Sequence, residues 1–557
     1  MKIRSCLFLI VLLTASMLNA ESSFPPKKIP LTSVLYEEMD TLYRLQGVPL
    51  PSGSRPWSTQ EASLILSAIP ADTKFQHLYS TIKERMEQNS LKHVSNHFSY
   101  LLTTNLATEA YLHTNPGSFT TSPDWIYAYD QRQPLARFIM ELAFSNRFYF
   151  ATSVDVGASS VTDDDTLPNI EAIGALYPSG EVTYQTMAKQ YTDSLASNLL
   201  LPSTDKTLAD WPMESQFSLG GDWWHLSTGR TRLQWGNGAS GNLVVGSHIA
   251  NHNHLSISFF SEVVKLQFLY LFLPDPTNAE IQRMFMGHRI EAQLNRNLRF
   301  TITENIMYKD DSIHIRYLDP TYIYHNLYDS NRLNSIASLE LDWAPISGLS
   351  LHGQLAIDQF RLANEPDTDA NAMGVIFQLA YAWQEQEGYW TATTEYSQTD
   401  PVLYRRDKVD FLIARGMHNN WPPVLIDYLG YSYGSDSQVL QTKLSYYRPG
   451  LFSAEGSVTI HRQGELTYDK PHHVDSITPD NSNNSEYPNV SGPSPSGDEI
   501  TERLIVGLAG TCYTDWRNLV LYAQANWIGR RIYHRPTKTY ADEASDLQLV
   551  MGMKIRF

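Results

Sequence analysis

The sequence predicts an all-β transmembrane barrel of about 18 antiparallel strands, preceded by a small helical region. Three features predict it: the alternating C-terminal strand, the alternation of short and long connections, and a secretory signal. The last eleven residues, Leu547 to Phe557, carry apolar side chains at the odd positions and mostly polar or small ones at the even positions. A period of two gives a strand one lipid-compatible face and one polar face. An edge strand of a soluble β-sandwich has the same period, so this stretch alone leaves both folds open.

The connection lengths favour the barrel over the sandwich. Hairpins of alternating polarity recur after residue 260, and short and long connections alternate between their strands. A barrel with short periplasmic turns and long external loops requires this order, whereas a sandwich does not. The predicted short turns are 295–297, 345–348, 385–388, 448–450 and 514–518. The predicted long connections are 274–284, 309–336, 362–371, 398–437, 464–502 and 532–545.

The N-terminus predicts export. Residues 1–20 have the form of a signal peptide, with Lys2 and Arg4 before an apolar core and a small-residue cleavage site at Ala20. Cys512 is the only cysteine after that point, so no internal disulfide is expected. Its position shares the parity of apolar neighbours, which predicts an outward-facing wall residue.

The mature chain divides into two parts. Residues 21–95 predict a periplasmic helical region, in which Ser58 and Glu61 form a capping-box pattern and Asp72 is a candidate cap. Its expected helices cover 33–45, 58–69 and 72–88. Residues 96–557 predict the barrel. About twelve strands follow residue 260, and the expected earlier strands are 98–112, 136–145, 147–157, 217–228, 229–236 and 242–249.

Three stretches resemble the Wzi-type capsule-assembly family. The first runs from Arg230 through Trp235-Gly236-Asn237-Gly238 to Val245. The second is Tyr317-Leu318-Asp319-Pro320 with the aromatic run that follows it, and the third is Tyr428-Leu429-Gly430 with Gly434-Ser435-Asp436. The chain departs from the family pattern at Asn237, where proline is expected, and at Asp319, where asparagine is expected.

The resemblance implies an outer-membrane barrel with a periplasmic helical bundle. It implies binding of exported polysaccharide and a role in attaching or assembling capsule or exopolysaccharide at the cell surface, without catalysis. The expected partners are surface polysaccharide, outer-membrane lipid and the barrel-assembly machinery, and we expect a monomer without a cofactor. The barrel signals by themselves equally allow a porin-like channel for small solutes.

Aromatic and acidic residues in the long connections are the candidate polysaccharide-binding side chains. Aromatic faces stack on sugar rings, while carboxylates accept hydrogen bonds from hydroxyl groups. The alternative is that these aromatics only pack the loops onto the barrel rim. The candidates are Tyr317, Asp319, Tyr322, Tyr324, Tyr328, Trp421, Asp427, Tyr428 and Asp436.

Charged residues at alternate positions predict the lining of the lumen. Arg230, Arg232, Arg289 and Glu291 are expected to face inward, where they either line a path or form a salt-bridge network that fills a closed lumen. We favour the network. Within the family-like stretch, Trp235, Gly236 and Gly238 are the motif residues, and the glycines predict a tight turn or bulge.

Other chemistries are weakly indicated. His248, His252 and His254 have a spacing that matches no strong zinc signature, so no metal site is expected. We find no nucleophile with a base at a recognisable spacing, so we expect no enzyme. The net charge of −17 argues against nucleic-acid binding.

Overall fold

The computed structural model describes residues 24–88, 91–95, 98–119, 124, 131–156, 161–162, 186–187, 195–198, 213–249, 251–274, 281–310, 312, 317, 319, 323–324, 332–359, 372–404, 409–416, 423–467, 494–514, 516 and 518–557. The predicted signal peptide lies outside the described residues.

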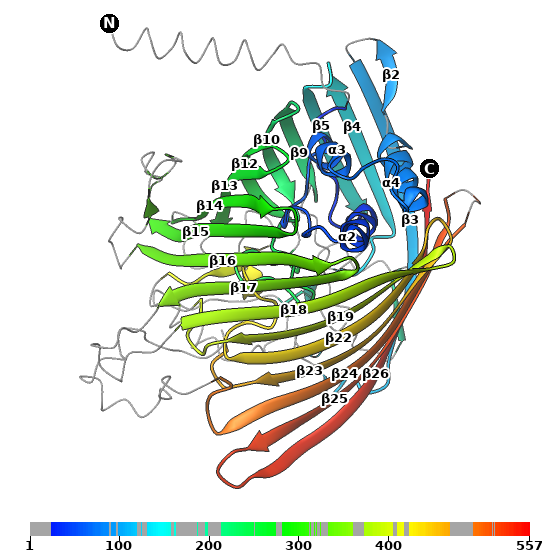
Figure 1. Cartoon of the computed structure of the whole chain (residues 1–557). Helices are drawn as coiled ribbons and strands as arrows, with labels where there is room; N and C mark the ends of the chain where they lie inside the picture. The colour runs from blue at the N-terminus through cyan, green and yellow to red at the C-terminus, as the bar shows by residue number, and fades with distance from the viewer. Residues whose placement is uncertain are drawn as a thin grey trace, which may run out of the picture.

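Eighteen antiparallel strands form a closed barrel, as predicted. Each strand pairs with the next along the chain, and β26 pairs with β3 to close the ring. Figure 1 shows this wall in chain order, from blue β3 to red β26. The wall strands are β3 (Phe98–His113), β4 (Ala136–Phe144), β5 (Phe148–Val156), β9 (Ser215–Gly220), β10 (Trp224–Thr231), β12 (His252–Phe260), β13 (Val264–Pro274), β14 (Gln282–Asn295), β15 (Leu298–Asp310), β16 (Leu333–Ile346), β17 (Leu349–Gln359), β18 (Ala372–Glu385), β19 (Gly388–Thr399), β22 (Ser437–Arg448), β23 (Phe452–Gln463), β24 (Glu499–Tyr513), β25 (Val520–His534) and β26 (Thr539–Arg556).

Shorter strands add to this wall or pair apart from it. Two of them pair with β3 on its flanks: β2 (Lys92–Ser95) and β8 (Leu195–Ser197). The remaining short pairs are β1 (Ser54–Arg55) with β11 (Gln234–Trp235), β20 (Leu412–Gly416) with β21 (Pro423–Tyr428), and β6 (Val161–Thr162) with β7 (Thr186–Met187).

The outer face of the wall is apolar, as the C-terminal alternation predicts. In β26, Leu547 and Met551 are exposed by 37% and 62%, whereas Gln548 and Val550 are buried toward the lumen. The same outward set continues across β24 through Leu504 and Leu508, and the exposed Cys512 shares their parity. A continuous apolar face of this kind is suited to contact with lipid.

Aromatic side chains gather on this face close to the short turns. Trp383 of β18 stacks on Trp390 of β19 with ring centroids 5.9 Å apart, and Trp390 contacts Tyr446 of β22 at 4.8 Å. Trp343 near the end of β16 is also exposed. Aromatic rings at this level form the interfacial girdle typical of membrane barrels.

Two parts of the predicted strand pattern were wrong. The expected strands 217–228, 229–236 and 242–249 are replaced in the wall by β9, β10 and β12. A tight turn at 221–223 divides the first, and the chain leaves the wall after Thr231, so the segment up to 249 lies outside the ladder. The expected long connection 532–545 is also mostly strand, because β25 and β26 remain paired as far as His534 and Thr539.

Three helices pack at the short-turn end of the barrel: α2 (Leu35–Gln46), α3 (Thr59–Ser67) and α4 (Gln76–Gln88) (Figure 1). The hydroxyl of Ser58 accepts a hydrogen bond from Glu61 N, which confirms the predicted cap of α3. The third helix begins at Gln76, later than a cap at Asp72 requires, and Thr73 Oγ1 instead accepts a hydrogen bond from Phe75 N. Among the described helices, none is both long and apolar enough to cross a bilayer.

The helices are tied to both the rim and the interior of the barrel. Gly348 N donates to Arg44 O over 2.7 Å at the β16–β17 turn, and Arg85 bonds Glu38, whose carboxylate also accepts from Tyr447 of β22. Deeper inside, Lys265 of β13 forms a buried ion pair of 2.6 Å with Glu61 of α3. The N-terminal region therefore contacts the barrel both at the short turns of β16–β22 and on the lumen face of β13.

Candidate functional site

A buried charge network lies on the lumen face of β14–β16. Arg289 of β14 donates Nε to Glu291 over 2.7 Å, and its two terminal nitrogens donate to Glu340 of β16 over 2.5 and 2.8 Å. All three side chains are at most 2% exposed, and Arg299 lies 3.6 Å from Glu291. Arg289 and Glu291 thus face the lumen as predicted, in the salt-bridge network that we favoured. Sequence reasoning missed Glu340, although its place on the polar side of an alternating strand was a usable signal.

The family-like motif folds into the lumen. Trp235 is 1% exposed, donates Nε1 to Gln267 over 2.9 Å, and lies beneath the guanidinium of Arg289 at 5.8 Å. Through β11 it pairs with β1 of the N-terminal segment, and Gly236 N donates to Gly53 O over 3.0 Å. The motif therefore joins the helical region to the barrel interior.

The glycines allow this loop to press against the wall. Gly236 has φ of +119°, and a Cβ there would lie 1.8 Å from Gln354 Nε2 and 2.2 Å from Asn242 Oδ1. A Cβ at Gly238 would lie 2.0 Å from Gly241 O. Only glycine fits backbone held this closely. These glycines allow the backbone of the loop to lie close to its neighbours, in line with the predicted tight turn.

Wall residues hold the loop by hydrogen bonds. The carboxylate of Glu395 in β19 accepts from Ala239 N over 2.6 Å and from Ser240 N over 2.8 Å. Gln354 of β17 accepts from Leu243 N over 3.1 Å. Glu395 and Gln354 were not predicted as partners of this loop, because the pattern of a strand does not indicate which loop contacts that strand.

Two connections build an apolar core inside the lumen, against β13–β18 and β22. The inner loop, residues 232–249, contributes Leu243 and Val245, and the connection after β19 contributes Tyr404 and Phe411. They pack against inward-facing wall residues such as Phe285, and every side chain of this cluster is nearly or fully buried. We define the inner loop and the described part of residues 400–436 together as the plug. Beside β13–β18, the described part of the lumen is thus a packed apolar interior.

The predicted acidic and aromatic residues of the second loop are used to build the plug. Tyr428 is 4% exposed and its hydroxyl bonds Ser435, while Asp427 is only partly exposed. Asp436 is fully buried, and its carboxylate accepts hydrogen bonds from Leu466 N and from Ser496. Tyr428 and Asp436 therefore hold loops together, and their surfaces are withheld from a ligand.

Asp400 gives the plug a pH dependence. Burial, reinforced by the nearby Asp436, raises the pKa of Asp400 from 3.8 to about 6, although Met373 N donates to its carboxylate over 3.0 Å. The folded state therefore binds more protons than the unfolded state between these values, so stability falls as pH rises from about 4 to 6. Asp400→Asn is expected to stabilise the protein by about 2 kcal/mol at pH 8 and by nothing at pH 3.

Thermal unfolding followed by circular dichroism at pH 3 and pH 8 measures this difference. Asp542→Asn, the same change at an exposed position, is the control and should leave both midpoints unchanged. An equal gain from Asp400→Asn at the two pH values would contradict the argument.

The first aromatic loop packs on the outside of the wall. Tyr317 and Tyr324 are 3% and 1% exposed, in a cluster with Tyr270, Met286 and Tyr308. These wall residues alternate with the inward-facing set, so the cluster lies on the outer surface of β13–β15. Tyr324 also stacks on His288 at 4.3 Å. The rim-packing alternative thus describes these two tyrosines better than a sugar platform, whereas Asp319 is exposed.

The remaining candidates are placed as follows. Tyr322, Tyr328 and Trp421 lie outside the described residues. Arg232 follows β10 and donates to Ser247 O over 2.6 Å, which ties the inner loop back to itself. Arg230 was predicted to face the lumen, but it pairs across the ladder with the exposed Asn253, while the neighbouring His225 and Ser227 are the buried, inward residues. A one-residue change of register reverses the face of every side chain.

The three histidines do not gather. His252 and His254 face inward from β12, and His254 Nε2 lies 3.2 Å from Lys28 Nζ. His248 lies in the inner loop, with Nε2 3.0 Å from Tyr428 O. Within the described ranges no three His, Cys, Asp or Glu side chains are arranged to hold a metal ion.

Comparisons with known proteins point to one solved fold. No protein-family model matches the chain, and no curated protein sequence matches it. The structure is similar to that of Wzi from Escherichia coli, an outer-membrane protein involved in group 1 capsule assembly and described as a carbohydrate-binding β-barrel. That match has a TM-score of 0.53 and 12% identity over 96% of this chain and 99% of Wzi.

Other solved barrels match less well. OccD3 of Pseudomonas aeruginosa has a TM-score of 0.38 and 8% identity over 84% of this chain and 92% of its own. OmpT of Vibrio cholerae has a TM-score of 0.34 and 8% identity over 84% of this chain and 100% of its own. The chain is an 18-stranded outer-membrane β-barrel with the fold of Wzi.

Proposed function

We propose that this barrel binds exported polysaccharide at its external surface and helps to attach or assemble capsule or exopolysaccharide there. The observation that carries the proposal is the combination of a Wzi-like fold over nearly the whole chain with a lumen occupied by the plug. A packed lumen suits a protein that displays a surface better than one that conducts solutes.

The binding surface is proposed at the external ends of the long connections. Asp319 and Asp427 are the two described candidates that retain exposed surface, and carboxylates accept hydrogen bonds from sugar hydroxyls. Tyr322, Tyr328 and Trp421 are the aromatic candidates that we retain as proposed stacking platforms. The buried candidates are proposed to hold the loops in place without contacting the polysaccharide; they are Tyr317, Tyr324, Tyr428 and Asp436.

Binding of surface polysaccharide, isolated from the bacterium that carries this protein, tests the proposal. The full chain in lipid nanodiscs is expected to retain the polysaccharide, and an Asp319→Ala, Asp427→Ala double variant to bind it at least tenfold more weakly. Glu387→Ala is the matched control, because Glu387 is exposed at the opposite, short-turn end. Failure of the unaltered protein to bind any surface glycan would overturn the proposal.

Planar-bilayer conductance tests the alternative of a porin-like channel. The plug predicts a silent barrel under conditions in which open porins conduct. A large, ohmic conductance together with no polysaccharide binding would favour the channel.

A further inference from the structure

A ladder of polar side chains crosses the outer face of β19–β25 near the long-connection end. Gln438 donates to Gln398 over 3.1 Å, Arg462 donates Nε to Glu502 over 3.1 Å, and Arg531 donates two nitrogens to the same carboxylate over 2.8 and 3.0 Å. These residues occupy directly paired positions on neighbouring strands. They therefore form one row around the outside of the barrel, separate from the plug.

The ladder carries an excess positive charge with free donors. Two guanidinium groups share the single carboxylate of Glu502, which is 17% exposed, while Arg462 and Arg531 are 38% and 45% exposed. Within the described residues, Arg462 Nη2 and Arg531 Nη1 donate no hydrogen bond. Arg531 is also held in place by the ring of Tyr540, with its guanidinium carbon 3.9 Å from the ring centroid. Two fixed guanidinium groups are suited to binding a phosphate.

The apolar belt begins immediately below the ladder. The next outward position on β22, β23 and β24 is Leu440, Ile460 and Leu504, exposed by 42%, 45% and 39%. Arginines at this level lie at the boundary between hydrocarbon and head groups, and the long connections place that boundary on the external side.

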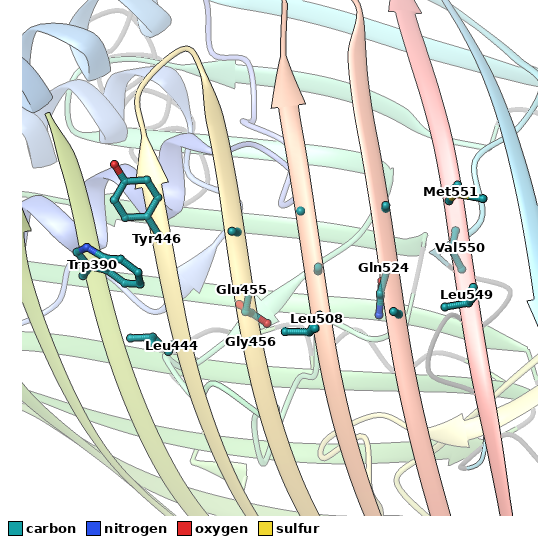
Figure 2. A pocket seen from close by; sticks show the side chains of 15 residues that line it. Trp390, Leu444, Tyr446, Glu455, Gly456, Leu508, Gln524, Leu549, Val550 and Met551 are labelled. Atoms are coloured by element: carbon teal, nitrogen blue, oxygen red, sulfur yellow. The ribbon is translucent and has the colours of Figure 1, made fainter.

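The belt below the ladder contains an apolar groove (Figure 2). It has a volume of about 540 Å³ on the outer face of β19–β26. Gly456 lies there between Leu444 and Leu508, and Ala525 lies between Leu508 and Leu549. Gly456 is six residues from Arg462 along β23. That is about 20 Å of strand, or about 15 Å of depth at the usual tilt, which is half of a 30 Å hydrocarbon core. The groove thus begins where an acyl chain of the outer leaflet ends.

We infer that Arg462 and Arg531 bind the phosphate of a phosphorylated glycolipid in the outer leaflet, whose acyl chain descends over Ile460 and Leu504 toward this groove. The site lies on the lipid-facing wall, so it is independent of the polysaccharide surface proposed above. It gives the barrel a preferred lipid on the β22–β26 side.

Native mass spectrometry of the full chain with added diphosphoryl lipid A tests the inference. The unaltered protein is expected to bind diphosphoryl lipid A at least tenfold more tightly than fully dephosphorylated lipid A. The Arg462→Gln, Arg531→Gln double variant is expected to lose this preference. Arg448→Gln, an exposed arginine at the short-turn end of β22, should keep it.

Three outcomes would overturn the inference. One is equal binding of the phosphorylated and dephosphorylated lipids by the unaltered protein, a measurement that does not depend on the variants folding. Another is retention of the preference by the double variant. The third is binding of inorganic phosphate as tightly as lipid A, which would indicate an anion site with no contribution from lipid.

Discussion

Arg289→Met is expected to destabilise the barrel by about 3–5 kcal/mol. The substitution removes the ion-pair partner of Glu340 and the nearer of the two arginines beside Glu291, and both carboxylates are at most 2% exposed in the lumen. A buried carboxylate without a partner costs far more than the buried ion pair contributes, since it loses water without gaining a compensating charge. The free energy of unfolding in urea, measured in detergent micelles, gives this difference directly.

Arg448→Met is the matched control for Arg289→Met. Arg448 also pairs with a glutamate, Glu387, but the two side chains are 42% and 70% exposed. Exposed pairs contribute at most about 1 kcal/mol. Adding Glu291→Gln and Glu340→Gln to Arg289→Met should recover part of the loss, because the unpaired charges are then gone. If Arg289→Met cost no more than Arg448→Met, the network would have to be hydrated and the lumen open to water.

Gly236→Ala is expected to displace the inner loop and open a conducting path. The new Cβ would overlap Gln354 Nε2 and Asn242 Oδ1, both of which help to hold the loop, and the positive φ adds backbone strain. Neither neighbour is a free surface side chain, so the loop must move away from the wall. Planar-bilayer conductance is expected to rise at least tenfold above the baseline of the unaltered protein.

Gly353→Ala is the control for Gly236→Ala. Gly353 lies in the wall strand β17, where the nearest atom to an added Cβ is Ile376 O at an ordinary 3.7 Å. It should leave both conductance and stability unchanged. A silent Gly236→Ala barrel of unchanged stability would mean that the inner loop adjusts locally and that the glycine is not required for closure.

The strands and the faces of their side chains could be predicted most directly from the sequence where only one face of a strand is apolar. In β26 the outward Leu547 and Met551 alternate with the buried Gln548, and the pattern gave both the faces and the register. In β13 the inward Leu269 and Leu271 contact the plug while Phe268 and Tyr270 are covered from outside, so both faces are apolar and the alternation disappears. The strand over 260–273 was nevertheless predicted and is β13, whereas the wrongly predicted strand 242–249 is an apolar run, with Leu243 and Val245, that packs into the plug.

The positions of the candidate site residues could be predicted only in part, for a related reason. Arg289 and Glu291 lie on a regular strand, where parity places them inward, and the structure agrees. Tyr317 and Tyr428 lie in loops without a period, and the sequence offered no means to tell a ring that stacks on sugar from one that packs against the barrel. Their burial depends on how each loop folds back against its partners, which are Tyr308 of the wall strand β15 for the first and Tyr404 of the plug for the second.

The amino-acid sequence by itself determined the closed antiparallel wall, the lipid-facing parity of its C-terminal strands, the helical N-terminus and the inward Arg289. Each of these follows from spacing between neighbours in the chain or from turn length. Only the tertiary structure decided that residues 232–249 enter the lumen and that Tyr317 and Tyr324 lie on the outer wall. An apolar loop is stabilised by whichever apolar surface it reaches, and that surface exists only once distant strands have come together.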